Sequence, residues 1–328
     1  MKFSKIKNYF AHSKHNFKKI NIFLFNGIKK ISFKSIYSKD KKKFNKIFKI
    51  SAITIVAAYL IGMIVSGIYI YKKQSEARSV KFAAKIYPFA VAWVNGSPIS
   101  VDEYFTQLNF IRTFSTKSQQ ALPDEKELKT QLISQLVDQK IVKQSAIKNH
   151  IKVSRKDVND AFNKIADANG GLSEVEKVLN EMYGMNIKEF KNMIKNQVYI
   201  EKIQNELLVQ IHAEHILIKD ETKAKDVLAQ VVKGDKSFED LAKEFSEDTG
   251  SNTNGGDLSW FGRGQMVKEF EDAAFSTPVG TVDSNLIKSE FGFHIIKVLE
   301  KKGTVDKTFD NWLSDIKNSS HIKNLLKV

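Results

Sequence analysis

The stretch GGDLSWFGRGQM, residues 255–266, combines four glycines, one arginine and several large apolar side chains. A glycine-rich loop with a basic residue raises the question of whether it binds phosphate. A phosphate loop would continue with Lys and then Ser or Thr, or would open a helix as G-x-G-x-x-G. Here the glycines are followed by Gln265, Met266 and Val267. The pattern therefore favours a turn that presents backbone and apolar side chains over a phosphate site.

The segments around this loop alternate between strand and helix patterns. A short strand pattern, IHAEHILI, is followed by two helix patterns, ETKAKDVLAQVVK and SFEDLAKEF. After the loop, KEFEDAAFS reads as a short helix and FGFHIIKVLEK as a terminal strand. The order strand, two helices, loop, helix, strand predicts a small α+β domain.

Three histidines on these strands, His212, His215 and His294, are the candidate titratable groups. Zinc is commonly bound by histidines, but residues three apart on a strand point to opposite faces. His212 and His215 are thus not expected to share a metal. Asp248 lies between His215 and His294 in sequence, and these two histidines on separate strands instead suggest a hydrogen-bonded trio with Asp248 that fixes tautomers and pKa values. A serine hydrolase is disfavoured because no G-x-S-x-G turn is present and Ser259 has no sign of activation.

The succession HILI, FSED, GGDLSWFGRGQMVKEFEDAAF, VG and FGFHIIKV resembles the parvulin-type (PpiC) peptidyl-prolyl isomerase domain over residues 212–302. The resemblance implies a small antiparallel sheet with surrounding helices, and neither metal nor cofactor. It implies a catalytic centre of His215, Asp248 and His294. It also implies that the loop forms a proline pocket, with the residues Leu258, Phe261, Gln265, Met266, Phe270 and Phe291.

The chain departs from the resemblance in two places. Glu269 stands where proline is common, which alters the entry to the next helix but removes no pocket side chain. The arginines of phosphate-specific members have no counterpart in KDETKAKD after the first strand. Specificity for phosphoserine–proline is therefore not expected.

The net charge of +15 belongs almost entirely to one end of the chain. Residues 1–49 contain fifteen lysines and a single acid, Asp40, which leaves +1 for everything after residue 49. This location argues against a nucleic-acid partner for the folded body. Residues 50–71 carry no charge over 22 residues, which is long enough for a transmembrane helix. A cleavable signal peptide is not expected, because its apolar region is shorter.

The lysine-rich side of the span predicts a cytoplasmic tail over residues 1–49 and a membrane anchor over 50–71. The tail either lies along an anionic leaflet or is a solvated segment that sets topology. Residues 72–90 are expected as a stalk, 91–208 as a module of about five helices, and 209–302 as the isomerase domain. Residues 303–328 are expected to form a helix that packs on the helical module.

The flanks resemble the SurA- and PrsA-like foldases, beginning with VAWVNGSPISVDEYF. Many PrsA-like proteins are lipoproteins; this chain has no cysteine, so a transmembrane anchor is expected in place of the lipid. We therefore expect a single-pass membrane foldase that isomerises X–Pro bonds in unfolded or newly exported polypeptides, with its domains outside the cytoplasm. The alternative is a tethered chaperone whose parvulin domain is catalytically degenerate. Client identity and oligomeric state stay open.

Overall fold

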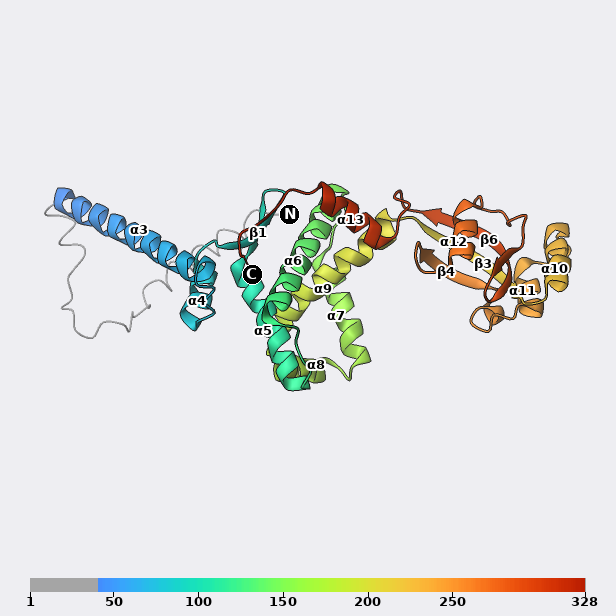
Figure 1. Cartoon of the computed structure of the whole chain (residues 1–328), viewed down its shortest axis with the longest axis horizontal. Coiled ribbons are helices and arrows are strands. Elements are labelled where there is room, and N and C mark those ends of the chain that lie inside the picture. Colours follow the sequence, from blue (N-terminus) through green and yellow to red (C-terminus); the bar gives the residue numbers. More distant parts are fainter. Residues whose placement is uncertain (1–40, 328) are drawn as a thin grey trace, which may run out of the picture. The chain divides into compact units, whose positions relative to one another are not determined.

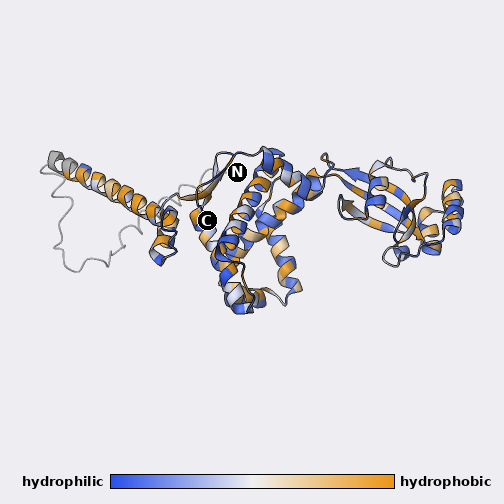
Figure 2. Ribbon diagram, viewed as in Figure 1, coloured by the Kyte–Doolittle hydropathy of each residue, from blue (hydrophilic) through white to orange (hydrophobic). Residues whose placement is uncertain are grey.

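The computed structural model describes residues 41–327, with side chains from Ile47 onward, so most of the expected basic tail lies outside the described residues. Within the described residues, the chain divides into two units, with the boundary between Val65 and Ser66. Helix α3 (Lys41–Tyr71) contains a stretch, Ile47–Tyr71, that is long and apolar enough to cross a membrane. Figure 2 shows hydrophobic residues along most of this helix. Its 25 residues correspond to about 37 Å, more than the ~30 Å hydrocarbon core of a bilayer.

The segment expected as a stalk contains a helix instead. Helix α4 (Arg78–Ile86) buries Val80, Ala83 and Ala84 in the core of the next module. The reason is helical spacing: these three residues lie on one face of the helix, while charged residues occupy other positions. Residues 72–90 are therefore partly packed rather than extended, which corrects the sequence-based expectation.

The helical module begins with a hairpin and continues with helices. Strands β1 (Ala90–Val94) and β2 (Ser97–Ser100) are antiparallel and are joined by a turn at Asn95 and Gly96. The helices are α5 (Val101–Ser118), α6 (Glu125–Lys148), α7 (Arg155–Ala168), α8 (Leu172–Val178) with a π-helical turn η1 (Leu179–Tyr183), and α9 (Ile187–Lys202) with a π-helical turn η2 (Ile203–Leu207).

Polar caps fix where these helices start. The Ser100 hydroxyl accepts the Glu103 N–H at 3.0 Å. Ser154 and Asn186 each form a full capping box, with Asp157 and Glu189 respectively. Such caps satisfy backbone N–H groups that have no partner within the helix.

The C-terminal residues only partly follow the expectation of a helix. Helix α13 (Phe309–Ser319) contacts α6, and Trp312 is 4% exposed in a cluster with residues of the helical module. Beyond it, β7 (Ile322–Asn324) pairs antiparallel with β1. The prediction of a helix that continues to the C-terminus is therefore wrong for these last residues. The unpaired edge of β1 offers them backbone hydrogen bonds that the end of a short helix does not provide.

A four-stranded antiparallel sheet organises the domain that the sequence predicts to be the isomerase, in agreement with the predicted fold class. Its strands, in the order β4-β3-β6-β5, are β3 (Gln210–Ile218), β4 (Asp257–Gly262), β5 (Ile287–Ser289) and β6 (Gly292–Lys302). The two inner strands were predicted from sequence, whereas β4 was predicted only as loop and β5 was missed. Helices α10 (Glu221–Lys233) and α11 (Phe238–Phe245) precede β4, and α12 (Lys268–Ser276) follows it.

Alternation along β3 separates two apolar cores. Ile216 and Ile218 pack with residues of α10 and α11. Ile211 and Ala213 lie in the other cluster, with Phe270 of α12. Successive strand residues point to opposite faces, so α12 covers one face of the sheet and α10 and α11 cover the other. His215, with an odd number like Ile211, belongs to the α12 side.

Candidate active site

The two buried histidines come from the central pair of strands. In the antiparallel register, His215 of β3 lies opposite Ile296 of β6, and His294 of β6 lies opposite Leu217. The histidines are therefore diagonal neighbours on one face of the sheet. They are 6% and 4% exposed, and their rings stack with centroids 5.5 Å apart at 20°.

A continuous chain of hydrogen bonds joins these rings to polar partners at both ends. His215 Nε2 lies 2.7 Å from Asp248 Oδ2, and His215 Nδ1 lies 3.3 Å from His294 Nδ1. His294 Nε2 lies 2.7 Å from Ser289 Oγ, which also accepts the Phe291 N–H at 3.1 Å.

These contacts assign the protons. Because a carboxylate only accepts, His215 donates from Nε2 to Asp248 and its Nδ1 carries a lone pair. His294 then donates from Nδ1 to His215, and its Nε2 accepts the Ser289 hydroxyl proton. Every ring nitrogen therefore has a hydrogen-bond partner while both imidazoles are neutral.

Burial favours the same neutral state. Desolvation lowers the pKa of His215, against the opposing effect of Asp248. Desolvation, together with the neighbouring His215, lowers the pKa of His294 to about 4. Burial would raise the pKa of Asp248, but hydrogen bonds from Ser251, His215 and the Gly250 N–H hold it below its usual value. The site at neutral pH thus has one anionic carboxylate and two uncharged rings.

An open apolar pocket of about 350 Å³ lies beside this chain of polar groups. The Phe270 ring meets both imidazoles close to edge-on, with centroids 5.6 Å from His215 and 5.2 Å from His294. The pocket is lined by His215, Leu217, Asp248, Leu258, Gln265, Met266, Val267, Phe270, Phe291 and His294. An apolar slot with a few convergent polar groups is the common form of a small binding site.

The glycine-rich loop shapes this pocket through close backbone contacts. Gly256 has φ +81° and its carbonyl accepts the His215 N–H at 2.9 Å. A Cβ at residue 256 would lie 2.2 Å from the His215 carbonyl oxygen, so only glycine fits. Farther along, the Gln265 side chain accepts the Gly262 N–H at 3.1 Å and closes the turn. Glu269 lies in the first turn of α12, where an acid suits the helix dipole.

Arg263, the basic residue of the loop, is held away from the pocket. Its guanidinium makes two hydrogen bonds to Asp306, at 2.6 Å and 2.9 Å, and lies 4.0 Å from the centroid of the Phe275 ring. This hydrogen bond, with the charge of Asp306 and Glu271, raises the pKa of Arg263. Since its donors are used in this network, Arg263 fixes the loop and does not line the pocket.

The structure brings together nearly all the residues singled out from sequence. Of these, only Phe261 lies outside the pocket: it is 2% exposed and packs behind Phe270, with ring centroids 6.0 Å apart. His212 lies elsewhere, as expected from strand alternation, with Nε2 2.9 Å from Asp257 Oδ1.

Four residues of the site were not predicted from the sequence. Ser251 donates to Asp248 at 2.5 Å, and Ser289 bonds to His294. Leu217 and Val267 add to the pocket wall. Leu217 was detectable, because it is two residues after His215 on a strand and must share its face. Nothing in the local pattern marks the two serines.

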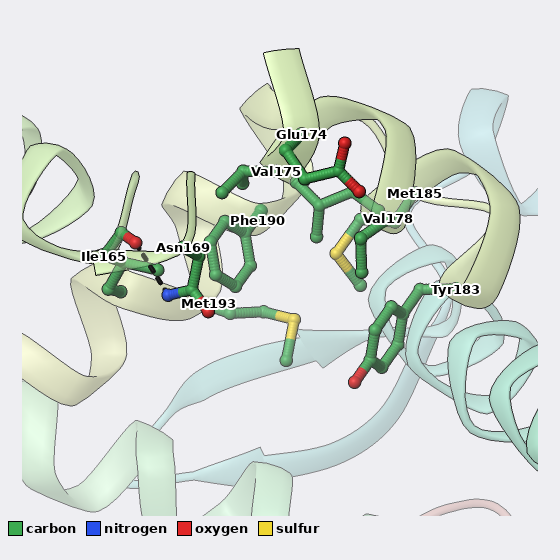
Figure 3. Close-up of a pocket in the computed structure, with 10 residues that line it drawn as sticks. Ile165, Asn169, Glu174, Val175, Val178, Tyr183, Met185, Phe190 and Met193 are labelled. Atoms are coloured by element: carbon green, nitrogen blue, oxygen red, sulfur yellow. Dashed lines mark hydrogen bonds between the residues drawn. The ribbon is translucent and has the colours of Figure 1, made fainter. Parts of the chain in front are cut away.

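A second hollow lies in the helical module. Figure 3 shows its apolar side chains, including Tyr183, Met185, Phe190 and Met193, in a cavity of about 470 Å³. An adjoining groove of about 670 Å³ shares Ile165, Phe190 and Met193 with this cavity. The groove is rich in side-chain amides: Gln107, Gln131, Gln135, Gln139, Asn196 and Gln197.

Comparison with known families identifies both parts of the chain. Residues 39–204 match the SurA-like N-terminal domain, and residues 195–302 match the PPIC-type PPIASE domain. The foldase protein PrsA of Geobacillus kaustophilus is 38% identical over 181 residues, 52% of this chain and 62% of that protein. The putative peptidyl-prolyl cis-trans isomerase Cbf2 of Campylobacter jejuni is 32% identical over 261 residues, 75% of this chain and 88% of that protein.

Among solved structures, the peptidylprolyl isomerase PrsA of Bacillus anthracis is 30% identical, with a TM-score of 0.30. That match covers 57% of this chain and 86% of the other chain. With the Geobacillus foldase, the match spans less than two thirds of the relative's own length.

Proposed function

The chain belongs to the family of foldases that join a SurA-like N-terminal domain to a PPIC-type isomerase domain, and we propose that it isomerises X–Pro bonds in unfolded or newly exported polypeptides. The observation that carries this proposal is the apolar pocket of Phe270, Met266 and Leu258 beside two neutral, hydrogen-bonded histidines. The pocket suits the apolar ring of proline. The two hydrogen-bonded histidines place polar groups beside the pocket without adding a charge to that of Asp248.

Rotation of an X–Pro bond has a barrier of about 18–20 kcal/mol because amide resonance must be broken. Holding the proline ring in the slot while the preceding carbonyl leaves water weakens that resonance in the twisted state. The slot then stabilises the transition state more than either planar ground state. A reduction of about 4–6 kcal/mol gives a roughly 10³–10⁴-fold acceleration.

The chemistry assigned to this chain's residues is non-covalent. The chain contains no cysteine, so it supplies no thiolate to attack the amide carbon. The Asp248 carboxylate accepts a hydrogen bond from the Nε2–H of His215 and so keeps that ring in one tautomer. The rings then present fixed dipoles to the twisting amide, and no proton needs to leave the site. Electrostatic groups that are already oriented cost no reorganisation during the reaction.

A prolyl-peptide isomerisation assay on residues 205–308 tests this function. The fragment keeps Asp306, the partner of Arg263. We expect the wild-type fragment to accelerate isomerisation and Phe270→Ala to lose most of the acceleration while folded. A folded wild-type fragment without acceleration would favour the degenerate, binding-only alternative.

We also propose that the groove of the helical module holds unfolded client segments, in line with a chaperone role for this part. Within the described residues, the side chains of Gln107, Gln135 and Gln197 make no hydrogen bonds, so their amides are open to a ligand. An amide pairs with a backbone N–H and C=O of any sequence. The one charged residue of the groove, Asp138, is neutralised by Lys317 at 2.7 Å.

Suppression of client aggregation tests the groove. Met193→Glu puts a charge among the apolar side chains, and should abolish suppression by the full chain. Leu172→Glu is the matched control, since Leu172 is 53% exposed in the same module and lines neither hollow. Both variants should isomerise a short prolyl peptide at the wild-type rate. Equal loss, or no loss, in the two variants would remove the groove as the client site.

For localisation we propose a single-pass membrane protein, N-terminus in the cytoplasm and residues from about 72 onward outside. The apolar stretch of α3 and the lysine-rich tail before it support this orientation. Protease added to intact spheroplasts should digest the isomerase domain. Digestion that requires lysis would overturn the topology.

A further inference from the structure

Helix α4 has two apolar faces, of which only one is used inside the protein. Val80, Ala83 and Ala84 are buried in the module core. On the opposite side, Phe82 is 65% exposed and Ile86 is 49% exposed. These two residues are four apart and therefore adjacent on the helix surface.

Cations surround this exposed pair. At 3.6 residues per turn, Arg78 and Lys85 lie at positions i−4 and i+3 from Phe82, on the same side of the helix. Lys72 and Lys73 add two more cations nearby in the sequence. Glu76, the one acid between residues 72 and 90, is paired with Arg112 at 2.5 Å, Lys129 at 3.3 Å and Lys81 at 3.8 Å. The exposed face thus combines apolar side chains with excess positive charge.

The position of α4 next to the end of α3 is fixed by packing within residues 66–328. Ile70 is 2% exposed in the same apolar cluster as Val80 and Ala84. The Tyr71 hydroxyl donates to the Ala90 carbonyl at 2.8 Å and accepts its N–H at 3.2 Å. Six residues separate Tyr71 from Arg78, a reach of at most about 25 Å. Helix α4 therefore stays close to the point where the apolar stretch ends.

We propose that α4 docks on an anionic lipid bilayer, with Phe82 and Ile86 inserted at the level of the headgroups and Arg78 and Lys85 beside lipid phosphates. A short helix with an apolar strip and flanking cations is suited to the membrane interface. Cations next to an anionic surface strengthen the binding of such a helix. This inference rests on the proposal that α3 crosses the membrane. With α4 docked, the helical module lies against the membrane surface, where exported polypeptides emerge, and is not carried at the end of a flexible tether.

The absence of cysteine in the chain allows a direct test on the full-length protein. Phe82→Cys, carrying an environment-sensitive fluorophore, is reconstituted into vesicles of phosphatidylcholine and phosphatidylglycerol. Val232→Cys is the matched control, because Val232 is 74% exposed on helix α10 of the isomerase domain. Ile86→Cys provides a second position if the label at residue 82 disturbs folding.

We expect spin-labelled lipids to quench the label at residue 82 at least twofold more than the label at residue 232, and aqueous iodide to do the reverse. In the background of Arg78→Gln and Lys85→Gln, the lipid quenching should weaken in anionic vesicles. Equal quenching at the two positions would overturn the proposal. Shielding that persists in detergent and grows with protein concentration would also overturn it, and would assign the face to a second copy of the chain.

Carbonate extraction separates this inference from its premise. A chain that stays in the membrane fraction but leaves the label at residue 82 open to water contradicts the docking alone. A chain released by carbonate contradicts the membrane-spanning α3 itself.

Discussion

Protonation of His294 should destabilise the isomerase domain as the pH falls below neutrality. Burial and His215 lower the pKa of His294 from 6.5 to about 4 in the folded protein, so the unfolded chain binds the proton first. The free energy of unfolding is therefore unaffected above pH 6.5 and declines from there to about pH 4. At about 1.4 kcal/mol for each pH unit of difference in pKa, the full loss is about 3 kcal/mol. At about pH 5 it is about 2 kcal/mol.

Urea unfolding of the fragment of residues 205–308 at about pH 7.5 and pH 5 measures this loss. His294→Gln should be less stable at the higher pH, because it breaks the bond to Ser289, but it should lose about 2 kcal/mol less on acidification. His212→Gln is the control, since His212 pairs with Asp257 outside the site and leaves His294 intact. An identical pH dependence in His294→Gln and wild type would refute the assignment of a neutral, buried His294.

Other substitutions separate the pocket from its supports. Phe270→Ala should reduce the isomerisation rate per folded molecule at least tenfold, equivalent to about 1.4 kcal/mol, because it removes the ring that meets both imidazoles. A smaller loss of rate than in Arg263→Ala would contradict the assignment of this pocket as the proline site. Arg263→Ala should chiefly lower the melting temperature of the fragment, since it frees Asp306, with a smaller effect on the rate of the folded fraction. Gly256→Ala should destabilise by about 1–3 kcal/mol in urea unfolding, because its methyl group meets the His215 carbonyl; unchanged stability would show that the strand and loop separate easily. Ser289→Ala leaves His294 Nε2 without its donor and should raise the pKa of that ring, which an NMR titration of the imidazole would detect.

Much of the site could be predicted from the sequence because its residues lie on regular elements. His215 and His294 are on strands, where alternation fixes the face, and Phe270 is on a short helix of clear pattern. The resemblance to the parvulin family supplied the pairing of these distant segments, which the local patterns do not contain. The membrane-spanning stretch of α3 was equally predictable, since 22 consecutive residues without a charge are typical of a transmembrane helix.

The serines and the protonation states needed the tertiary structure. Ser251 and Ser289 are ordinary residues until the fold places their hydroxyls beside Asp248 and His294. The direction of each proton follows from the whole chain of contacts, since one carboxylate at its end decides every donor after it. The role of Arg263 depends likewise on Asp306, which is 43 residues away in sequence.

The sequence by itself determined the order of the parts: an apolar helix, a helical module and an α+β domain with histidines on its central strands. Periodicity and charge are local properties, so they can be read without knowing what lies across the fold. Only the tertiary structure decided that residues 72–90 hold a packed helix and that the chain's last segment forms a strand on β1. Both outcomes depend on partners distant in sequence, because a short helix or strand gains its stability from the surface it covers rather than from its own propensity.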